Sequence, residues 1–187
     1  MNKRKEILLA ALKDADGDVR KAAAEAMERL ETRERLDALA KKVESGQMLE
    51  KVKVIYALSD LRGPRVAAIL SAALKDPSED VRAAAARALG TMGDATVLQA
   101  LVEALKDASP IVVRAVVEAF SNFRDPRLLG PLVQVLKHQD SGVVERALEA
   151  VSRFGDKRAE EALVYFASKG NPKMKGIALR GLGVMDA

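Results

Sequence analysis

The sequence predicts an all-α solenoid built from six helical pairs of 31 residues each. The phrase Leu-Lys-Asp stands at 74–76 and returns 31 residues later at 105–107. The chain of 187 residues aligns with itself at this period without a gap, and it is rich in Ala and Leu, which favour helices. A fixed period of a few tens of residues indicates stacked units that bury their apolar faces only against their neighbours.

The period is clearest in two neighbouring columns of residues. The small column is Ala26, Ala57, Ala88, Ala119, Ala150 and Gly181. The apolar column is Met27, Leu58, Leu89, Phe120, Val151 and Leu182. Small side chains let two helix axes approach to the lower end of the usual ~8–10 Å, so we expect close contacts at the small column. The predicted repeats are 1–30, 31–61, 62–92, 93–123, 124–154 and 155–187, all in a single domain of residues 1–187.

Each repeat is predicted to contain a first helix, A, and a second helix, B. In the third repeat Val81, Ala85, Ala88, Leu89 and Met92 fall on one face of a helix. The apolar run 7–12 is interpreted as the first A helix. The later A helices are expected to begin after Thr32, Gly63, Asp94, Asp125 and Asp156. The B helices are expected to begin after Asp16, Gln47, Ser78, Ser109, Asp140 and Asn171, five of which are typical N-caps. Twelve helices result.

The segment 80–90, Asp-Val-Arg-Ala-Ala-Ala-Ala-Arg-Ala-Leu-Gly, followed by Met-Gly-Asp at 92–94, resembles the short bacterial HEAT-like repeat, also called the phycobilisome-lyase HEAT-like repeat. Residues 18–24 are a second good match, whereas the tetratricopeptide and ankyrin signatures are absent. The resemblance implies a right-handed superhelix with B helices on its concave side and A helices on its convex side. It also implies that the Arg after Val pairs with an acid in the preceding turn, as Asp14 with Arg20 and Asp76 with Arg82.

Catalytic and cofactor chemistry finds little support. The chain has no Cys and one His, His138, which we interpret as a solvated turn residue. A usual zinc site and a nucleophile–histidine system are therefore not supported, and the iron hydroxylases that share the HEAT-like fold need several His-Glu pairs. We predict no catalytic, metal or cofactor-binding residue, and no enzyme activity.

Two further classes of partner are disfavoured. No apolar run is long enough to span a membrane, and the run 7–12 is cut by charged residues, so we expect a cytoplasmic protein. A net charge of +4 permits nucleic-acid binding, but the first five B helices carry no net charge and only 172–184 is positive. A polyanion needs clustered cations, so nucleic-acid binding ranks third among the functions considered.

The remaining hypothesis is a non-enzymatic scaffold that binds a partner protein or peptide on the concave face. Positions of the B helices outside the apolar columns change in type from repeat to repeat, as a binding surface on a constant scaffold would. The predicted binding residues are Leu49, Val52, Lys53, Tyr56, Arg87, Ile111, Arg114, Glu118, Arg146, Glu149 and Arg180. The alternative is an accessory subunit resembling phycobilin lyase components, which handles a chromophore or its carrier protein.

Two stretches depart from the repeat. Leu49, Val52 and Tyr56 form an apolar stripe at i, i+3 and i+7, typical of an interface hot spot. Alternatively this helix has rotated, and Met48 fills the core where Glu50 replaces an apolar residue.

The last helix is expected to expose an apolar and basic outer edge. Its apolar residues are Met174, Ile177, Leu179 and Leu182. This edge is open to three interpretations: self-association, docking of a partner, or the cut end of a longer array.

Overall fold

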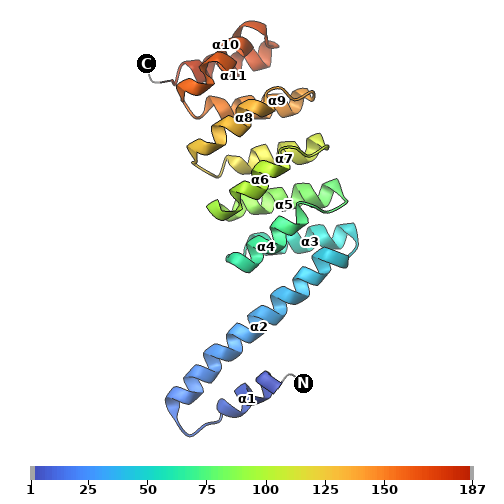
Figure 1. Ribbon diagram of the computed structural model, residues 1–187, viewed down its shortest axis with the longest axis vertical. Helices are drawn as coiled ribbons and strands as arrows, with labels where there is room; N and C mark the ends of the chain where they lie inside the picture. Colours follow the sequence, from blue (N-terminus) through green and yellow to red (C-terminus); the bar gives the residue numbers. More distant parts are fainter. Residues whose placement is uncertain (1–2, 186–187) are drawn as a thin grey trace. The chain divides into compact units, whose positions relative to one another are not determined.

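The computed structural model describes residues 3–185 and is entirely helical over that range, apart from turns. It divides into two compact units, 1–46 and 47–187 (Figure 1). Residues 1, 2, 186 and 187 lie outside the described part, and with them the outer limits of the first and last predicted repeats. The six repeat boundaries stay a prediction.

The first compact unit holds helices α1 (Lys3–Ala11) and α2 (Gly17–Ser45). In the second unit, A and B helices alternate and form a stack from α3 to α11 (Figure 1). Its B helices are α3 (Met48–Ser59), α5 (Glu79–Met92), α7 (Pro110–Phe120), α9 (Ser141–Ser152) and α11 (Pro172–Leu182). Its A helices are α4 (Pro64–Ala73), α6 (Leu98–Ala104), α8 (Leu129–Val135) and α10 (Glu160–Lys169). Short 3-10 turns precede the last three: η1 (Ala95–Val97), η2 (Pro126–Leu128) and η3 (Lys157–Ala159).

All six predicted starts of the B helices are confirmed. The side chain of Asp16 accepts hydrogen bonds from the backbone N–H groups of Asp18 and Val19, and Asp140 accepts one from Val143. Such caps satisfy N–H groups that have no partner within the helix. The starts after Gly63, Asp94, Asp125 and Asp156 are also confirmed. Arg127 and Arg158 hydrogen-bond to Asp125 and Asp156, which lowers the pKa of each carboxyl to about 2.

The predicted break after Thr32 is wrong. Helix α2 runs unbroken through this position, and its full length is 29 residues. The described part of the chain therefore has eleven α-helices rather than twelve. Later repeats turn at a left-handed glycine, such as Gly93 with φ 65°, or restart at a proline, such as Pro64. Residues 31–35 read Glu-Thr-Arg-Glu-Arg and contain neither. Nothing in this segment stops a helix, so the helix goes on.

The B helices form the core of the second unit by packing against one another in order. Helix α5 contacts α3 on one side and α7 on the other, and α7 continues the series to α9 and α11. The A helices contact their own B partners more than each other. The four alanines 83–86 are all buried by this packing. Ala83 and Ala84 therefore face neighbouring helices, because α5 is packed on both sides.

Close contact at the small column is confirmed. A Cβ atom added to Gly90 of α5 would lie 2.6 Å from the Cβ of Ala119 on α7. One added to Gly181 of α11 would lie 2.5 Å from the Cβ of Ser152 on α9. Real Cβ atoms do not approach so closely, so these helix pairs depend on glycine where they touch.

Ion pairs between repeats replace the predicted pairing within a turn. The Nζ of Lys51 lies 2.6 Å from the Oδ2 of Asp76, and the Nε of Arg82 lies 2.6 Å from the Oδ2 of Asp107. Lys51 and Arg82 occupy the same position in successive repeats, and each reaches an acid 25 residues further on. The hydrogen bond from Arg82 is the main reason that the pKa of Asp107 is below its usual value.

The predicted contacts of Arg20 with Asp14 and of Arg82 with Asp76 exist, but neither is made to a carboxylate. Arg82 donates to the backbone carbonyl of Asp76 at 2.9 Å, while its carboxylate partner is Asp107. Arg20 likewise donates to the carbonyls of Asp14 and Ala15, at 2.7 and 2.8 Å. The arginine is still bound to the preceding turn, but through main-chain oxygens.

His138 belongs to the turn before α9, as predicted, and it is half-buried. Its Nδ1 accepts a hydrogen bond from the backbone N–H of Asp140 at 2.9 Å. In the preceding repeat the carboxylate of Asp107 accepts the equivalent bond from Ser109 at 2.8 Å. Val113 stands one period after Arg82, so this repeat has no arginine to pair with position 138. His138 makes the same hydrogen bond within the turn that Asp107 makes, without an ion pair within residues 3–185.

Candidate binding surface

We use the term B surface for the exposed positions of α3, α5, α7, α9 and α11. One column of the repeat runs along it: Tyr56, Arg87, Glu118, Glu149 and Arg180. All eleven predicted binding residues lie on these helices, and none is buried. Val52 and Glu149 are half-buried and the other nine are exposed. The structure thus leaves the predicted set accessible, and contact with a partner stays a prediction.

The apolar stripe of α3 lies on the surface. Leu49 is 61% exposed and Tyr56 is 47% exposed. Met48 is 46% exposed, so the alternative in which Met48 fills the core is wrong. The core side of α3 consists of Val54, Ile55 and Leu58.

The acids on the B helices from α7 onward all have cationic partners. Glu118 lies 3.8 Å from Arg87 of α5, and Glu149 lies 3.3 Å from Arg146 on its own helix. The carboxylate of Glu145 lies 2.5 Å from the Nζ of Lys173 on α11. Hydrogen bonding to this lysine is the main reason that the pKa of Glu145 is below its usual value.

Several arginines in the same region have no such partner. Within residues 3–185, no ion pair or side-chain hydrogen bond is formed by Arg114, Arg124, Arg153 or Arg180. All four are exposed. The paired acids and the unpaired arginines together leave this part of the B surface with positive charge that the chain itself does not neutralise.

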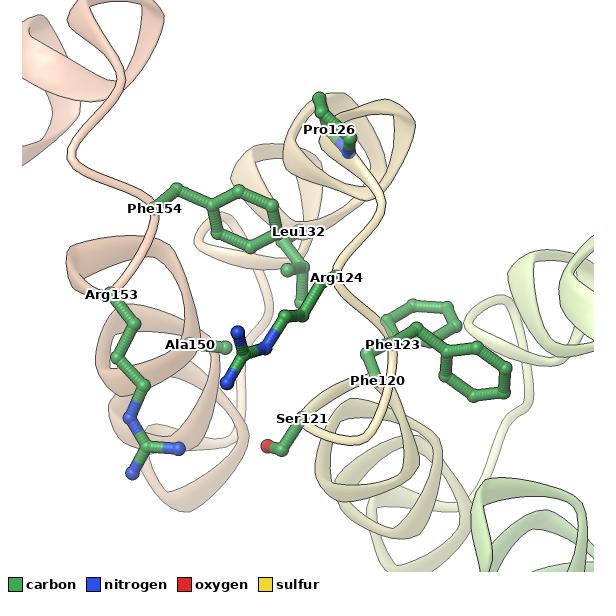
Figure 2. Close-up of a pocket in the computed structure, with 9 residues that line it drawn as sticks. All are labelled: Phe120, Ser121, Phe123, Arg124, Pro126, Leu132, Ala150, Arg153 and Phe154. Atoms are coloured by element: carbon green, nitrogen blue, oxygen red, sulfur yellow. The ribbon is translucent and has the colours of Figure 1, made fainter. Parts of the chain in front are cut away.

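A hollow of about 490 Å³ lies between the C-terminal ends of α7 and α9. In Figure 2 the side chain of Arg124 extends from the turn after α7 toward Ala150 on α9, and the ring of Phe154 is turned toward Leu132. Ser121 and Ala150 also line it, and they are one period after Gly90 and Ala119. Neither is glycine, so α7 and α9 cannot approach here as closely as α5 and α7 do.

A second hollow of about 490 Å³ lies between α9 and α11. Arg153 lines both hollows, and Arg180 lines the second. We call Arg124, Arg153 and Arg180 the arginine row. Sequence reasoning placed only Arg180 among the binding residues. It missed Arg124 because this residue lies in a turn, outside the predicted B helices. The change from Gly90 to Ser121 one period later is the sequence signal that could have pointed to looser packing at this place.

The outer edge of the last helical pair differs from the prediction. Met174 and Ile177 are buried, because α11 packs against α9 and α10. The exposed apolar residues there are Val164 and Tyr165 on α10, Leu179 on α11, and Val184. An exposed apolar edge therefore exists, but with a different set of side chains.

No helix within residues 3–185 has the length and apolar character needed to cross a membrane. Over the same residues, no group of three or more His, Cys, Asp or Glu side chains is arranged to hold a metal ion.

The sequence model of HEAT repeats matches residues 5–78, 45–121, 66–152 and 102–183, which together cover most of the chain. This chain belongs to the HEAT repeat family. No curated protein sequence matches it.

Solved structures resemble these HEAT repeats at low sequence identity. A designed armadillo repeat protein in complex with the peptide (KR)4 is 18% identical, with 99% of this chain and 100% of the other covered and a TM-score of 0.62. The CpcE–CpcF complex of phycocyanin lyase from Nostoc sp. PCC7120 is 23% identical, with coverages of 96% and 76% and a TM-score of 0.54. Human deoxyhypusine hydroxylase is 24% identical, with coverages of 85% and 64% and a TM-score of 0.64. These likenesses concern the fold.

Proposed function

We propose that this HEAT-repeat protein is a non-enzymatic scaffold that binds a partner protein or peptide on the B surface. The observation that carries the proposal is the contrast between a constant core and a variable exposed column. Positions 58 and 89 are buried leucines, whereas the exposed column at 56, 87 and 118 reads Tyr, Arg and Glu. A solenoid needs the first pattern to fold, and the second is available for recognition.

The packing of the second compact unit supports the choice of surface. B helices contact one another along the stack more extensively than A helices do. In a curved stack, neighbouring repeats are closer together on the inner side than on the outer side. The closer packing of the B helices therefore favours the B side as the inner, concave side. A preorganised inner face loses little conformational freedom on binding, which favours an extended or helical segment as the ligand. A designed armadillo repeat protein of similar fold binds a peptide.

Selection from a random peptide library tests the proposal. Selected peptides should lose affinity for Tyr56→Ala, Arg87→Ala and Glu118→Ala variants, all changed at exposed B-surface positions. The matched controls are Gln99→Ala and Gln134→Ala, which change exposed residues of the A helices α6 and α8. Peptides that respond only to the control changes, or a library that yields no binder, would overturn the proposal.

The Tyr56→Ala variant also separates binding from stability. Tyr56 is about half exposed, so its removal should change the free energy of unfolding by less than about 1 kcal/mol. An aromatic residue beside exposed aliphatic side chains is a typical hot spot, so binding should weaken. A large loss of stability with unchanged binding would assign Tyr56 to the core instead.

A second candidate function is that of an accessory subunit that handles a chromophore or its carrier protein. The likeness to the CpcE–CpcF complex favours it. The hollow between α7 and α9, with Phe154 and two arginines, is a better candidate pocket than the open stripe on α3. The absorbance spectrum of a free bilin mixed with the protein distinguishes the two functions. A bound bilin would show a shifted absorbance band, and Arg124→Gln should reduce the intensity of that band.

A further inference from the structure

We infer that the partner presents an acidic segment, whose carboxylates bind the arginine row of Arg124, Arg153 and Arg180 while an adjacent apolar side chain enters the hollow between α7 and α9. This inference rests on the proposed function and names the chemistry of the ligand. It adds a site, the C-terminal ends of α7, α9 and α11, of which only Arg180 was expected from the sequence.

Charge complementarity is the first argument. Arginines are normally satisfied by carboxylates, carbonyls or aromatic rings, because a guanidinium has five N–H donors. Arg82, Arg127 and Arg158 of this chain each hold a carboxylate. The three members of the arginine row have no ion-pair partner within the described residues, although the neighbouring helices α7 and α9 carry Glu118 and Glu149. Those two acids are already paired, so the acids that would complement the row must come from another molecule.

The relative placement of the three arginines is the second argument. Arg124 lies in the turn after α7, Arg153 is the C-cap residue of α9, and Arg180 lies in the last turn of α11. They therefore mark corresponding ends of three successive B helices. Arg153 is shared by the two hollows, which makes the row continuous. An extended segment that follows this row crosses the ends of the helices and passes both hollows.

The hollow between α7 and α9 supplies the apolar part of the site. The half-buried ring of Phe154 lines it and is turned toward the buried side chain of Leu132 (Figure 2). The guanidinium of Arg124 lies beside them, near Ala150 (Figure 2). A leucine or phenylalanine between carboxylates would place its side chain against the half-buried ring of Phe154 and its neighbours beside Arg124 and Arg153. The volume of about 490 Å³ is large enough for one such side chain.

A protein segment fits these features better than a nucleic acid does. A phosphate backbone repeats its charge at short intervals and needs many cations in register. Here only three unpaired arginines form the row, and the carboxylates of Glu118 and Glu149 lie on the same surface. Ordinary acidic residues, spaced by apolar ones, match three separated cations, and an uncharged residue of the segment can lie beside Glu149, which lines the second hollow.

The test uses the full-length protein and a fluorescein-labelled peptide in which Glu and Asp flank a central Phe-Leu pair. One control peptide has Gln and Asn in place of the acids, and another has Ala in place of Phe and Leu. Anisotropy titrations should show binding of the acidic peptide that weakens between about 50 and about 300 mM salt, since exposed ion pairs are screened. Both control peptides should bind at least about tenfold more weakly, a loss that corresponds to about 1.4 kcal/mol.

Variants of the protein locate the site. Arg124→Gln, Arg153→Gln and Arg180→Gln should each weaken binding about three- to fivefold, the range of one exposed ion pair. Lys106→Gln removes the same charge from an exposed position at the C-terminal end of α6 and should leave the affinity unchanged. Circular dichroism of each variant checks that the helices are intact.

Three outcomes would overturn the inference. The neutral peptide could bind as well as the acidic one, Lys106→Gln could cost as much as Arg153→Gln, or duplex DNA could displace the peptide at equal charge concentration. The last result would favour nucleic acid as the partner. If the random library instead yields B-surface binders that lack acids, the proposed function stands and only this inference fails.

Discussion

Arg82 and Asp107 connect two successive repeats through a bidentate ion pair. The Nε and Nη2 atoms of Arg82 lie 2.6 and 2.9 Å from the two carboxylate oxygens of Asp107. The side chains are only 17% and 12% exposed. An ion pair this sheltered is costly to break from one side, because the remaining charge stays away from water.

We expect Arg82→Met to lower the free energy of unfolding by about 2 kcal/mol. One repeat later, Val113 and His138 occupy the positions of Arg82 and Asp107. A double variant Arg82→Val/Asp107→His copies that solution, so its cost should be about 1 kcal/mol less than the sum of the single changes. Urea denaturation of the wild type, Arg82→Met, Arg82→Val, Asp107→His and the double variant measures these costs. Strictly additive costs of Arg82→Val and Asp107→His would show that the two positions do not interact.

The same ion pair predicts a pH dependence. Hydrogen bonding to Arg82 lowers the pKa of Asp107 in the folded protein, so the ionised carboxylate favours folding. This contribution is complete above the unfolded-state pKa of about 3.9 and is lost as the pH falls through the lower folded-state value. Asp107→Asn should therefore be less stable than the wild type at pH 7, and the difference should shrink below about pH 4. A difference that is constant from neutral to acidic pH would contradict this assignment.

The contact between Gly90 and Ala119 predicts an unusual effect of alanine. Replacing a helical glycine with alanine normally stabilises a helix by up to about 1 kcal/mol. At position 90 the new Cβ would lie 2.6 Å from that of Ala119, so overpacking should dominate and cost about 1–3 kcal/mol. Gly176→Ala on α11 is the matched control, since its Cβ would meet only the flexible end of Arg180 at 3.6 Å. Thermal unfolding should move in opposite directions for the two variants.

Helix α2 predicts how proline is tolerated at one position of the repeat. Residues 33, 64, 126 and 157 are equivalent, and 64 and 126 are prolines. Arg33 lies inside α2, so Arg33→Pro should lower helix content and cost about 3 kcal/mol. Lys157 is the first residue of η3, so Lys157→Pro should have little effect. Far-ultraviolet circular dichroism measures the helix content of both proline variants. Arg33→Ala is the control for the lost side chain. Equal helix content of the two proline variants would mean that the helix is interrupted near residue 33 in the wild type.

Self-association through the last helical pair stays a prediction, and Leu179 offers its test. This side chain is 59% exposed, about as open as Tyr165 and Val184 of the same C-terminal part of the chain. If the edge joins two copies, Leu179→Glu should shift sedimentation velocity profiles toward the monomer at high concentration. Lys175→Glu changes an exposed residue of the same helix and controls for the added negative charge. A wild-type protein that sediments as a monomer throughout would rule this edge out as the interface.

The sequence was sufficient for the period and for almost every helix start, because both depend on local chemistry. Asp16, Asp140 and Asn171 bind N–H groups two or three residues away, which spacing alone predicts. Helix α2 is continuous because residues 31–35 contain no helix stop signal. The 31-residue period suggested a break there, because Thr32 is equivalent to the turn residues Gly63, Asp94, Asp125 and Asp156. The family resemblance named Asp76 as the partner of Arg82 but missed the carboxylate of Asp107, because finding it requires knowing how far one repeat is displaced from the next.

The candidate site was less predictable than the fold. That none of the eleven predicted binding residues is buried followed from the helical pattern. The arginine row did not, because Arg124, Arg153 and Arg180 become neighbours only when the ends of three helices are brought together. The hollow could not be predicted either, because Phe120, Phe154 and Arg124, which line it, come together only when two repeats are stacked.

Unequal spacing along the stack has a mechanical consequence. Between α5 and α7, Gly90 and Ala119 place the helices in direct contact, leaving no layer of side chains that can deform. Between α7 and α9, the hollow beside Phe154 gives side chains room to change rotamer. The joint between α7 and α9 is therefore the more compliant of the two. A ligand that fills the hollow would stiffen the solenoid at this joint.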